Sequence, residues 1–331
     1  MSPGGCVTST DLTTKDRFQV LSIDGGGVRG IFAAAMLAKL EEDLGQSVLD
    51  HFDLVVGTST GGVIAASLGI GKSPREITDA YASSAKVIFP PYRSRFSTGL
   101  LRSKYSPRGM EEVVRREFGD ALLADSKVPL VIPSFDIGEN KLHLFKTPHH
   151  PRLRRDWKIP LWEVAMATSA APVFFPAFRV PGENLRLIDG GVWANNPSMV
   201  GVAEAVSMFG QPLESIRVLS VGTTADVRIG GRGRDRGGLI PWLRPPNLLN
   251  TVLAGQSASA VAQVQHLLGP SRIRRFDALA PNVIKLDGTD VRDLLAKAAH
   301  HSRVFCPEFE EFFADHVAPP YKPIYGPNAE S

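Results

Sequence analysis

One glycine-bounded turn carries a serine that could act as a nucleophile. Gly57-Thr-Ser-Thr-Gly61 matches the pattern G-x-S-x-G and lies directly after the short apolar run Asp53-Leu-Val-Val56. An apolar helical segment follows the second glycine. Between a strand and a helix this pattern is typical of a nucleophile elbow, a sharp turn that exposes a serine hydroxyl at the N-terminus of the helix. The pattern therefore predicts Ser59 as the nucleophile of an acyl-transfer reaction.

A second glycine-rich turn offers backbone donors for negative charge. Asp24-Gly-Gly-Gly-Val-Arg-Gly30 follows the apolar run Phe18–Ile23 and opens the next helical segment. Several backbone N–H groups and the positive end of a helix dipole are expected to point to one place there. The intermediate of acyl transfer develops an oxyanion that needs such donors. We therefore expect this turn to provide the oxyanion hole for Ser59.

The same turn permits another interpretation, in which the chain binds a nucleotide. Its glycines that fit the dinucleotide-binding pattern G-x-G-x-x-G are Gly25, Gly27 and Gly30. Asp50 or Asp53 stands about where an acid that binds ribose is expected. A nucleotide-binding protein that uses the Gly25–Gly30 loop, with a structural Ser59, is therefore the alternative from another functional class.

A serine nucleophile needs a general base, and a carboxylate at another strand end is suited to that role. Asp189-Gly-Gly191 ends the apolar run Leu185–Ile188, and its glycines allow another segment to approach closely. In a parallel sheet this strand end can reach the same edge as Ser59. We therefore expect Asp189 to form a catalytic dyad with the serine.

A Ser-His-Asp triad is the alternative within the hydrolases. The histidines that follow the aspartate in the chain order of α/β-hydrolases are His266, His300, His301 and His316. None of them has a recognisable motif around it, so a surface or core position is expected for each. A Ser-His-Asp esterase nevertheless remains open at this point.

Strand and helix patterns alternate along the chain, which predicts an α/β fold with a mostly parallel sheet. Apolar runs of strand length occur at 18–23, 53–56, 128–134, 141–145, 185–188 and 216–221. Helical patterns occur at 30–44, 60–68, 73–87, 106–118, 161–170, 197–209, 247–268 and 290–304. Ser73-Pro-Arg-Glu76 supplies a capping box for the third of these helices.

Length and composition predict one large domain. The 331 residues are 43% hydrophobic, which suffices for a substantial core. We expect a flexible N-terminus over 1–16 and a single catalytic domain over 17–331, with a mobile basic loop at 228–246 and a C-terminal helical region at 247–331. The sequence shows neither the pattern of a secretory signal nor an apolar stretch that could span a bilayer. A cytoplasmic location is therefore expected.

No metal, cofactor, DNA or RNA is expected as a partner. Cys6 and Cys306 are the two cysteines, and the first lies in the N-terminal segment, so a thiolate metal site is not indicated. His149 and His150 form a pair without a spaced third ligand. The net charge of +3 is too small to indicate nucleic-acid binding.

The three turns together resemble the motifs of patatin-like phospholipases. Asp24-Gly-Gly-Gly-Val-Arg-Gly30, Gly57-Thr-Ser-Thr-Gly61 and Asp189-Gly-Gly191 stand in the order of that family's oxyanion loop, nucleophile elbow and dyad aspartate. Ala167-Thr-Ser-Ala-Ala-Pro172 is similar to the segment that precedes the aspartate in the family. The resemblance covers roughly Phe18–Thr223 and is specific, because three spaced motifs must coincide.

This resemblance implies a three-layer α/β/α sandwich and calcium-independent hydrolysis of acyl esters in phospholipids or related lipids. It implies Ser59 as the nucleophile, Asp189 as the general base and an acyl-enzyme intermediate. The oxyanion hole that it implies consists of the backbone N–H groups of Gly25, Gly26 and Gly27, with Arg29 as an electrostatic helper.

Membrane and nucleotide partners are also expected. The basic loop 228–246 mixes arginines with apolar residues, which suits contact with anionic lipid headgroups. We therefore expect a peripheral enzyme at the inner face of the membrane. The compact chain also resembles bacterial patatin-like effectors of antiphage signalling, which implies a cyclic-nucleotide activator. A homo-oligomer is a further expectation.

Overall fold

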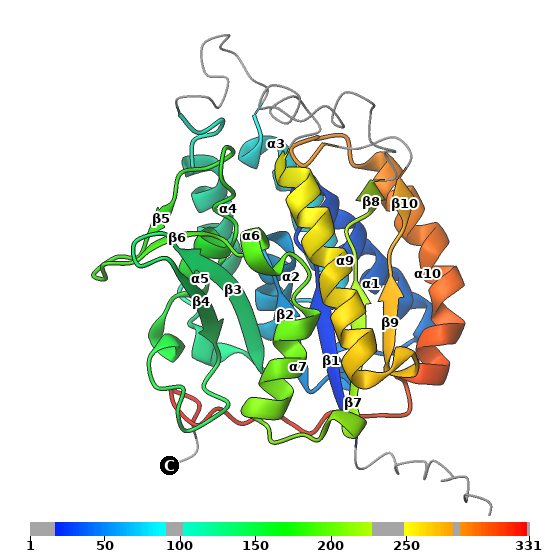
Figure 1. Cartoon of the computed structure of the whole chain (residues 1–331). Coiled ribbons are helices and arrows are strands. Elements are labelled where there is room, and N and C mark those ends of the chain that lie inside the picture. The colour runs from blue at the N-terminus through cyan, green and yellow to red at the C-terminus, as the bar shows by residue number, and fades with distance from the viewer. Residues whose placement is uncertain (1–16, 91–101, 227–247, 281–284, 330–331) are drawn as a thin grey trace, which may run out of the picture.

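A computed structural model of the chain describes residues 17–90, 102–226, 248–280 and 285–329. The expected flexible N-terminus 1–16 and the expected basic loop 228–246 lie outside these described residues. Within them, strands and helices alternate and form a central sheet between two layers of helices (Figure 1). The fold is therefore the three-layer α/β/α sandwich that the sequence predicts.

Eight strands of the described residues form one mixed sheet in the order β5-β6-β3-β2-β1-β7-β9, and β4 pairs with β3. Their bounds are β1 (Phe18–Ile23), β2 (Leu54–Gly57), β3 (Leu130–Asp136), β4 (Lys141–Lys146), β5 (Phe178–Arg179), β6 (Arg186–Asp189), β7 (Ile216–Val221) and β9 (Ile273–Phe276). From β3 to β9 neighbouring strands are parallel, whereas β4, β5 and β6 join antiparallel. A separate parallel pair is formed by β8 (Ala225–Asp226) and β10 (Leu279–Ala280).

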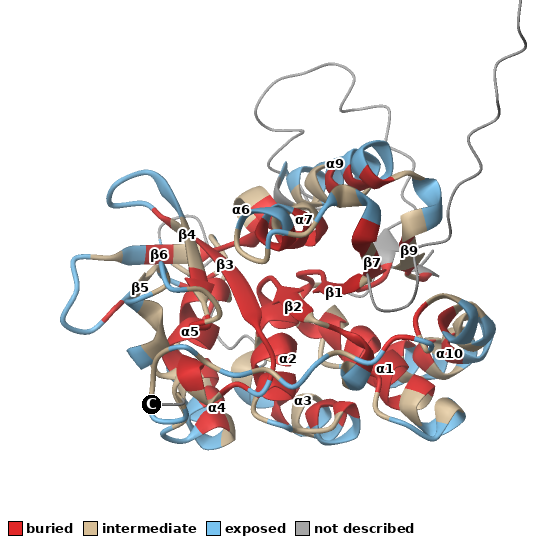
Figure 2. Ribbon diagram, turned by 90° about the horizontal axis from the view of Figure 1, so that it is seen from below, coloured by how far each residue is buried: buried red, intermediate tan, exposed pale blue. Residues whose placement is uncertain are grey.

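Helices cover both faces of the sheet (Figure 2). One layer contains α1 (Gly30–Leu44), α2 (Thr60–Gly69), α3 (Pro74–Ile88), α4 (Arg108–Phe118), α5 (Leu161–Thr168) and α10 (Arg292–Phe312). The other contains α6 (Gly191–Ala194), α7 (Ser198–Ser207) and α9 (Leu248–Leu268). The expected capping box begins α3, because the hydroxyl of Ser73 accepts the backbone N–H of Glu76.

Two hydrophobic cores explain why apolar residues stand at successive positions in the central strands β1 and β2. In β1, Val20 belongs to the core under α7 and α9, and Leu21 belongs to the core under α1 and α2. Both side chains are fully buried. A strand that is buried on both faces needs apolar residues at successive positions, not only at alternate ones.

The C-terminal part differs from the helical region expected over 247–331. It also contains β9, which the sequence did not indicate. Two of the four residues in its sequence Ile-Arg-Arg-Phe are charged, so it lacks the apolar run expected of a buried strand. In addition, α10 continues past Val304 and through Pro307 to Phe312. Full burial of Phe309 favours this extension, although a proline removes one helical hydrogen bond.

Candidate active site

Ser59 occupies the tip of a strained turn between β2 and α2. Its backbone φ is 55° and its ψ is −123°, a conformation that costs a non-glycine residue roughly 1–3 kcal/mol. Two glycines make the turn sterically feasible. A Cβ atom on Gly57 would stand 2.1 Å from the carbonyl oxygen of Gly61, and one on Gly61 would stand 2.2 Å from that of Ile23. The strand, sharp turn and helix expected of a nucleophile elbow are therefore present.

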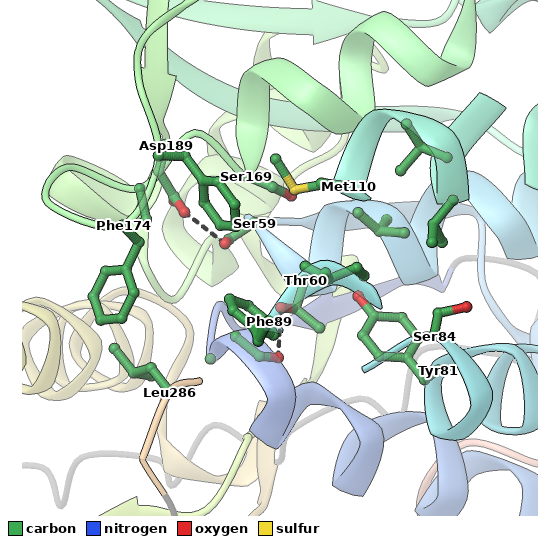
Figure 3. Close-up of a pocket in the computed structure, with 18 of the residues that line it drawn as sticks. Ser59, Thr60, Tyr81, Ser84, Phe89, Met110, Ser169, Phe174, Asp189 and Leu286 are labelled. Atoms are coloured by element: carbon green, nitrogen blue, oxygen red, sulfur yellow. Dashed lines mark hydrogen bonds between the residues drawn. The ribbon is translucent and has the colours of Figure 1, made fainter. Parts of the chain in front are cut away.

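The hydroxyl of Ser59 donates a hydrogen bond of 2.6 Å to Oδ2 of Asp189 (Figure 3). Both residues are almost fully buried. The backbone N–H of Ser59 donates to Oγ1 of Thr168 at 2.9 Å, and the hydroxyl of Thr168 donates to the carbonyl oxygen of Pro133 at 2.7 Å. The two residues singled out from the sequence, 130 positions apart, thus meet within hydrogen-bonding distance.

Asp189 arrives on an antiparallel strand, so the expected route through a parallel sheet is wrong. β2 pairs with the start of β3, where Val56 lies opposite Val131. β6 runs against the far end of β3, where Asp189 lies opposite Ser134. Because β4 occupies the other edge of β3 along both stretches, β2 and β6 share one edge. Their C-terminal ends therefore point toward each other, which brings the carboxylate to the serine.

Burial sets the proton affinity of Asp189. It raises the pKa of this carboxyl to about 6, against the lowering effects of the hydrogen bonds from the Ser59 hydroxyl and the Gly191 N–H. The latter bond is 2.7 Å long and ends on Oδ1. A carboxylate with this pKa remains mostly ionised at pH 7 and accepts a proton more readily than an ordinary aspartate. The environment of Asp189 therefore suits a general base.

The glycine turn packs directly against the elbow, but its N–H groups differ in their partners. A Cβ atom on Gly25 would stand 3.3 Å from the Cβ of Ser59. The N–H of Gly25 donates to the carbonyl oxygen of Asn195 at 2.9 Å. No group among the described residues accepts a hydrogen bond from the N–H of Gly26 or Gly27, and both residues line the cavity beside the serine. Gly26 and Gly27 thus present the available donors, while Gly25 is fastened to Asn195.

Arg29 lies behind the turn. Its guanidinium donates to the carbonyl oxygens of Gly26 at 3.4 Å and Thr224 at 3.1 Å. The residue does not belong to the lining of the cavity next to Ser59. The structure therefore brings Arg29 to the turn and not to the cavity wall.

The serine and the aspartate open into a narrow apolar cavity of about 110 Å³. Figure 3 shows Phe174 and Leu286 on one side of the Ser59–Asp189 pair, and Tyr81 on the other. Further apolar lining comes from Val63, Ile77, Met110 and Val114. Such walls suit an apolar ligand, and Ser59 lies among them.

The histidines are not part of this arrangement. No histidine of the described segments lines the cavity. Nε2 of His316 lies 2.8 Å from Oδ2 of Asp53, and the ring of His301 stacks on Phe305. His266 is exposed near the end of α9, and His300 is exposed on α10. The geometry therefore does not favour a Ser-His-Asp triad.

The glycine turn is also not an open dinucleotide-binding loop. The N–H of Val28 donates to the carbonyl oxygen of Leu286 at 2.8 Å. A Cβ atom on Gly27 would stand 2.3 Å from that same oxygen. Asp53, considered as a ribose-binding acid, accepts the backbone N–H of Gln19 instead. The space and the donors that a pyrophosphate would need are therefore partly taken by the chain itself.

Three residues that position the site were not identified from the sequence. The hydroxyl oxygen of Thr168 accepts the backbone N–H of Ser59, and the backbone carbonyl oxygen of Asn195 accepts that of Gly25. Arg275 binds Asp24 at the start of the glycine turn. Asn195 acts through its backbone carbonyl oxygen, which every residue has, so its side chain gave no signal. Arg275 gave no signal, because nothing in the sequence pairs it with Asp24.

Residues 17–90, 102–226, 248–280 and 285–329 contain neither a metal-ligand cluster nor a membrane-spanning helix. These residues contain no group of three or more histidine, cysteine, aspartate or glutamate side chains arranged to hold a metal ion. They also contain no helix that combines the length and the apolar character needed to cross a bilayer.

Comparison with known proteins extends these observations. A family model described as patatin-like phospholipase matches residues 21–201, which is more than half of the chain. A cGAMP-activated phospholipase of Pseudomonas aeruginosa is 32% identical over 274 residues, covering 81% of this chain and 80% of that protein. One of Vibrio cholerae serotype O1 is 34% identical over 236 residues, covering 64% of this chain and 66% of that protein.

A solved structure, that of VipD from Legionella pneumophila, aligns with 89% of this chain and 67% of its own at 12% identity and a TM-score of 0.49. The family model spans both the glycine turn at 25–30 and the aspartate at 189, the segments that meet around Ser59. The family model matches more than half of the chain, and a relative 32% identical aligns with 81% of it. The protein is therefore a hydrolase that belongs to the patatin-like phospholipase family.

Proposed function

We propose that the chain is a lipid acyl hydrolase that cleaves fatty-acyl esters of membrane phospholipids, with Ser59 as nucleophile and Asp189 as general base. The observation that carries the proposal is the 2.6 Å hydrogen bond from the serine hydroxyl to the carboxylate. This hydroxyl stands at a strained turn beside the backbone donors of Gly26 and Gly27. Acyl transfer requires these three parts: a nucleophile, a base and an oxyanion site.

The reaction proceeds in two steps. As Oγ of Ser59 bonds to the ester carbonyl carbon, its proton passes to Oδ2 of Asp189, and the N–H groups of Gly26 and Gly27 stabilise the oxyanion. Collapse breaks the ester C–O bond, and Asp189 returns the proton to the departing lysophospholipid oxygen. Water then attacks the acyl-enzyme and gives a proton to Asp189, and fatty acid leaves as Ser59 regains its hydrogen. The positive end of α2, which begins at Thr60, favours the negative charge next to the serine.

An apolar cavity supports a long-chain acyl substrate. At about 110 Å³ it is smaller than the roughly 300–1,000 Å³ of most ligand pockets, so a fatty-acyl chain requires its walls to separate. A protein that takes its substrate from a bilayer would work as a peripheral enzyme, here at the inner face of the membrane.

The proposal is tested by incubating the protein with vesicles of defined diacyl phospholipids. Fatty acid and lysophospholipid should appear in equal amounts, because each cycle cleaves one ester bond. Hydrolysis of a small water-soluble ester without any release from phospholipid would contradict the proposed substrate class and leave the acyl-transfer chemistry intact.

The pH dependence of catalysis should follow Asp189. The base must be ionised to accept a proton, so kcat/KM is expected to fall about tenfold per pH unit below the pKa of about 6 and to be flat above it. An ordinary aspartate would shift this decline to near its reference pKa of 3.8. Initial rates between pH 4.5 and 8.5, with folding checked by circular dichroism, provide the test. A constant rate down to pH 4.5 would contradict a buried carboxylate base.

A cyclic nucleotide is proposed as activator. Support comes from two relatives named cGAMP-activated phospholipases, and the small resting cavity fits an enzyme that must open before it acts. The test measures fatty-acid release with a panel of cyclic dinucleotides and trinucleotides, of which cGAMP is the first choice. One of them is expected to raise the release at least about tenfold, an effect that corresponds to a typical coupling free energy. Basal activity that is high and indifferent to the whole panel would contradict the activation, not the dyad.

A further inference from the structure

A row of polar side chains crosses the sheet near the C-terminal ends of three neighbouring parallel strands. Ser22 on β1 lies opposite Ser220 on β7, and Ser220 lies opposite Arg275 on β9. Both serines are fully buried, and the side chain of Arg275 is 25% exposed. Polar groups in a core cost stability unless they are bonded to one another. Packing alone therefore does not explain such a row.

The side chain of Arg275 extends across β7 and binds Asp24, the first residue of the glycine turn. Its two terminal nitrogens donate to the two oxygens of Asp24, with distances of 2.9 and 2.8 Å. On the way, one of these nitrogens donates to the hydroxyl of Ser220 at 2.8 Å. A bidentate guanidinium–carboxylate pair fixes orientation as well as distance. The position of Asp24, and with it the start of the turn, is therefore set by a residue on β9.

The same guanidinium holds the turn from a second side. Arg275 donates to Oδ2 of Asp277 at 2.7 Å, and Oδ1 of Asp277 accepts the N–H of Thr224 at 2.9 Å. The neighbouring Thr223 donates from its hydroxyl to the carbonyl oxygen of Gly25 at 2.9 Å. A Cβ atom on the next glycine of the turn would stand 2.2 Å from that hydroxyl oxygen. The turn is thus held at Asp24 and at the segment 223–224, and Arg275 binds the first directly and the second through Asp277.

The network also extends toward the aspartate of the dyad. Asn196 donates to the hydroxyl of Ser220 at 2.9 Å, and the carbonyl oxygen of the preceding Asn195 accepts the N–H of Gly25. These two asparagines follow α6, the short helix that begins directly after Asp189 and Gly190. The polar row therefore connects the turn with the segment that follows α6, a few residues after Asp189.

We infer that Arg275 is a positioning residue of the active site, whose guanidinium fixes the glycine turn so that the N–H groups of Gly26 and Gly27 face the oxyanion formed at Ser59. This inference rests on the oxyanion role that the proposed function gives to the turn. Arg275 lies outside residues 21–201, which the family model matches, so the match assigns it no role.

The ionisation of Asp24 agrees with this arrangement. Burial raises the pKa of Asp24 to about 6, although the charge of Arg275 and its hydrogen bonds lower it. Without the guanidinium, the carboxylate would be buried with its principal positive partner removed. A buried group in that state either takes up a proton or moves toward water, and both change the bonds that hold the turn.

The test replaces Arg275 with methionine and measures kcat and KM with a defined phospholipid. Because the oxyanion donors would be displaced and the acyl cavity retained, kcat is expected to fall about 100-fold. KM should stay within about threefold, since no ground-state contact is removed. R275K, which keeps the charge without the planar fork, should recover part of the lost kcat. The rate of Ser59 modification by a fluorophosphonate should follow kcat across these variants.

A matched ion pair on another part of the sheet provides the structural control. Lys146 on β4 bonds to Glu204 on α7 at 2.5 Å, with side-chain exposures of 13% and 4%. Neither residue lines the cavity. K146M is therefore expected to lower Tm while kcat stays within about twofold of the wild type. A loss of kcat in K146M as large as in R275M would overturn the positioning role, because it would show a general effect of destabilisation.

The remaining outcomes separate this inference from the proposed function. A folded R275M variant with the kcat of the wild type would overturn the positioning role of Arg275 and leave the proposed function intact. If R275M does not fold, D24N/R275M removes the more deeply buried of the two carboxylates that lose their guanidinium. A folded double variant that stays slow supports the inference, and one with wild-type kcat overturns it. If the wild-type protein releases fatty acid no faster than S59A, the proposed function itself fails.

Discussion

Replacing Ser59 with alanine is expected to lower kcat for phospholipid hydrolysis by roughly 10⁴- to 10⁶-fold. Alanine removes the oxygen that forms the acyl-enzyme, whereas the turn, the cavity and the neighbouring donors stay in place. KM should therefore change little. Release of fatty acid from a defined phospholipid, measured at saturating substrate, gives the comparison.

Single replacement of histidines provides the control for this prediction. His300→Gln and His316→Gln each remove a candidate base of a Ser-His-Asp triad, but neither residue lines the cavity. Both variants are expected to keep kcat within a few-fold of the wild type once folding has been verified. A loss in either that approaches the loss in Ser59→Ala would show that a histidine, not Asp189, serves as the base.

Replacing Asp189 with asparagine is expected to lower kcat by about 10³- to 10⁴-fold, by analogy with the loss when a catalytic aspartate becomes an amide. The asparagine has nearly the same shape, and its oxygen can still accept the N–H of Gly191. It cannot accept the proton of Ser59, so the nucleophile would remain a neutral hydroxyl. The same phospholipid assay, at a pH above 7, measures the effect.

The same variant is expected to be more stable than the wild type. The folded-state pKa of Asp189 is about 6, above its reference value of 3.8, so ionising it disfavours the folded state. This cost develops as the pH rises from about 4 to about 6 and amounts to ~3 kcal/mol above that range. Asp189→Asn should therefore raise Tm by at least about 3 °C at pH 7.5, and by about half as much at pH 5.

Asp136→Asn is the matched control for both effects. Asp136 is a buried carboxyl at the other end of the pairing between β3 and β6, where its Oδ1 accepts the backbone N–H groups of Gly138 and Arg186. Its replacement should leave kcat unchanged and should not raise Tm. An Asp189→Asn variant that keeps wild-type activity, or loses activity only through unfolding, would contradict the role of the aspartate.

The sequence allowed the fold class and the central pair of residues to be predicted because both depend on local patterns. Glycines around Ser59 are required by a turn that leaves no space for side chains, and buried parallel strands require continuous apolar runs. These constraints act within a few residues and are visible in any single sequence. The alternation of strand and helix patterns likewise indicated an α/β fold with a mostly parallel sheet, but not the order of the strands.

The route of Asp189 and the role of Arg275 could not be predicted, because they depend on pairings between distant segments. Nothing near Asp189 indicates that β6 runs antiparallel and shares an edge of β3 with β2. The strand β9 contains two arginines, one of which crosses a neighbouring strand to bind Asp24, 251 residues earlier in the chain. The occupied N–H of Gly25 is likewise a property of the assembled fold.

The central claim, that Asp189 activates Ser59, is tested most directly by the rate at which a fluorophosphonate modifies the wild-type protein and the Asp189→Asn variant. Mass spectrometry of the peptides should place the adduct on Ser59. The modification rate should fall at least about 10³-fold in the variant, and in the wild type it should decline below a pKa of about 6. An adduct on another residue, or equal rates in the two proteins, would contradict the claim.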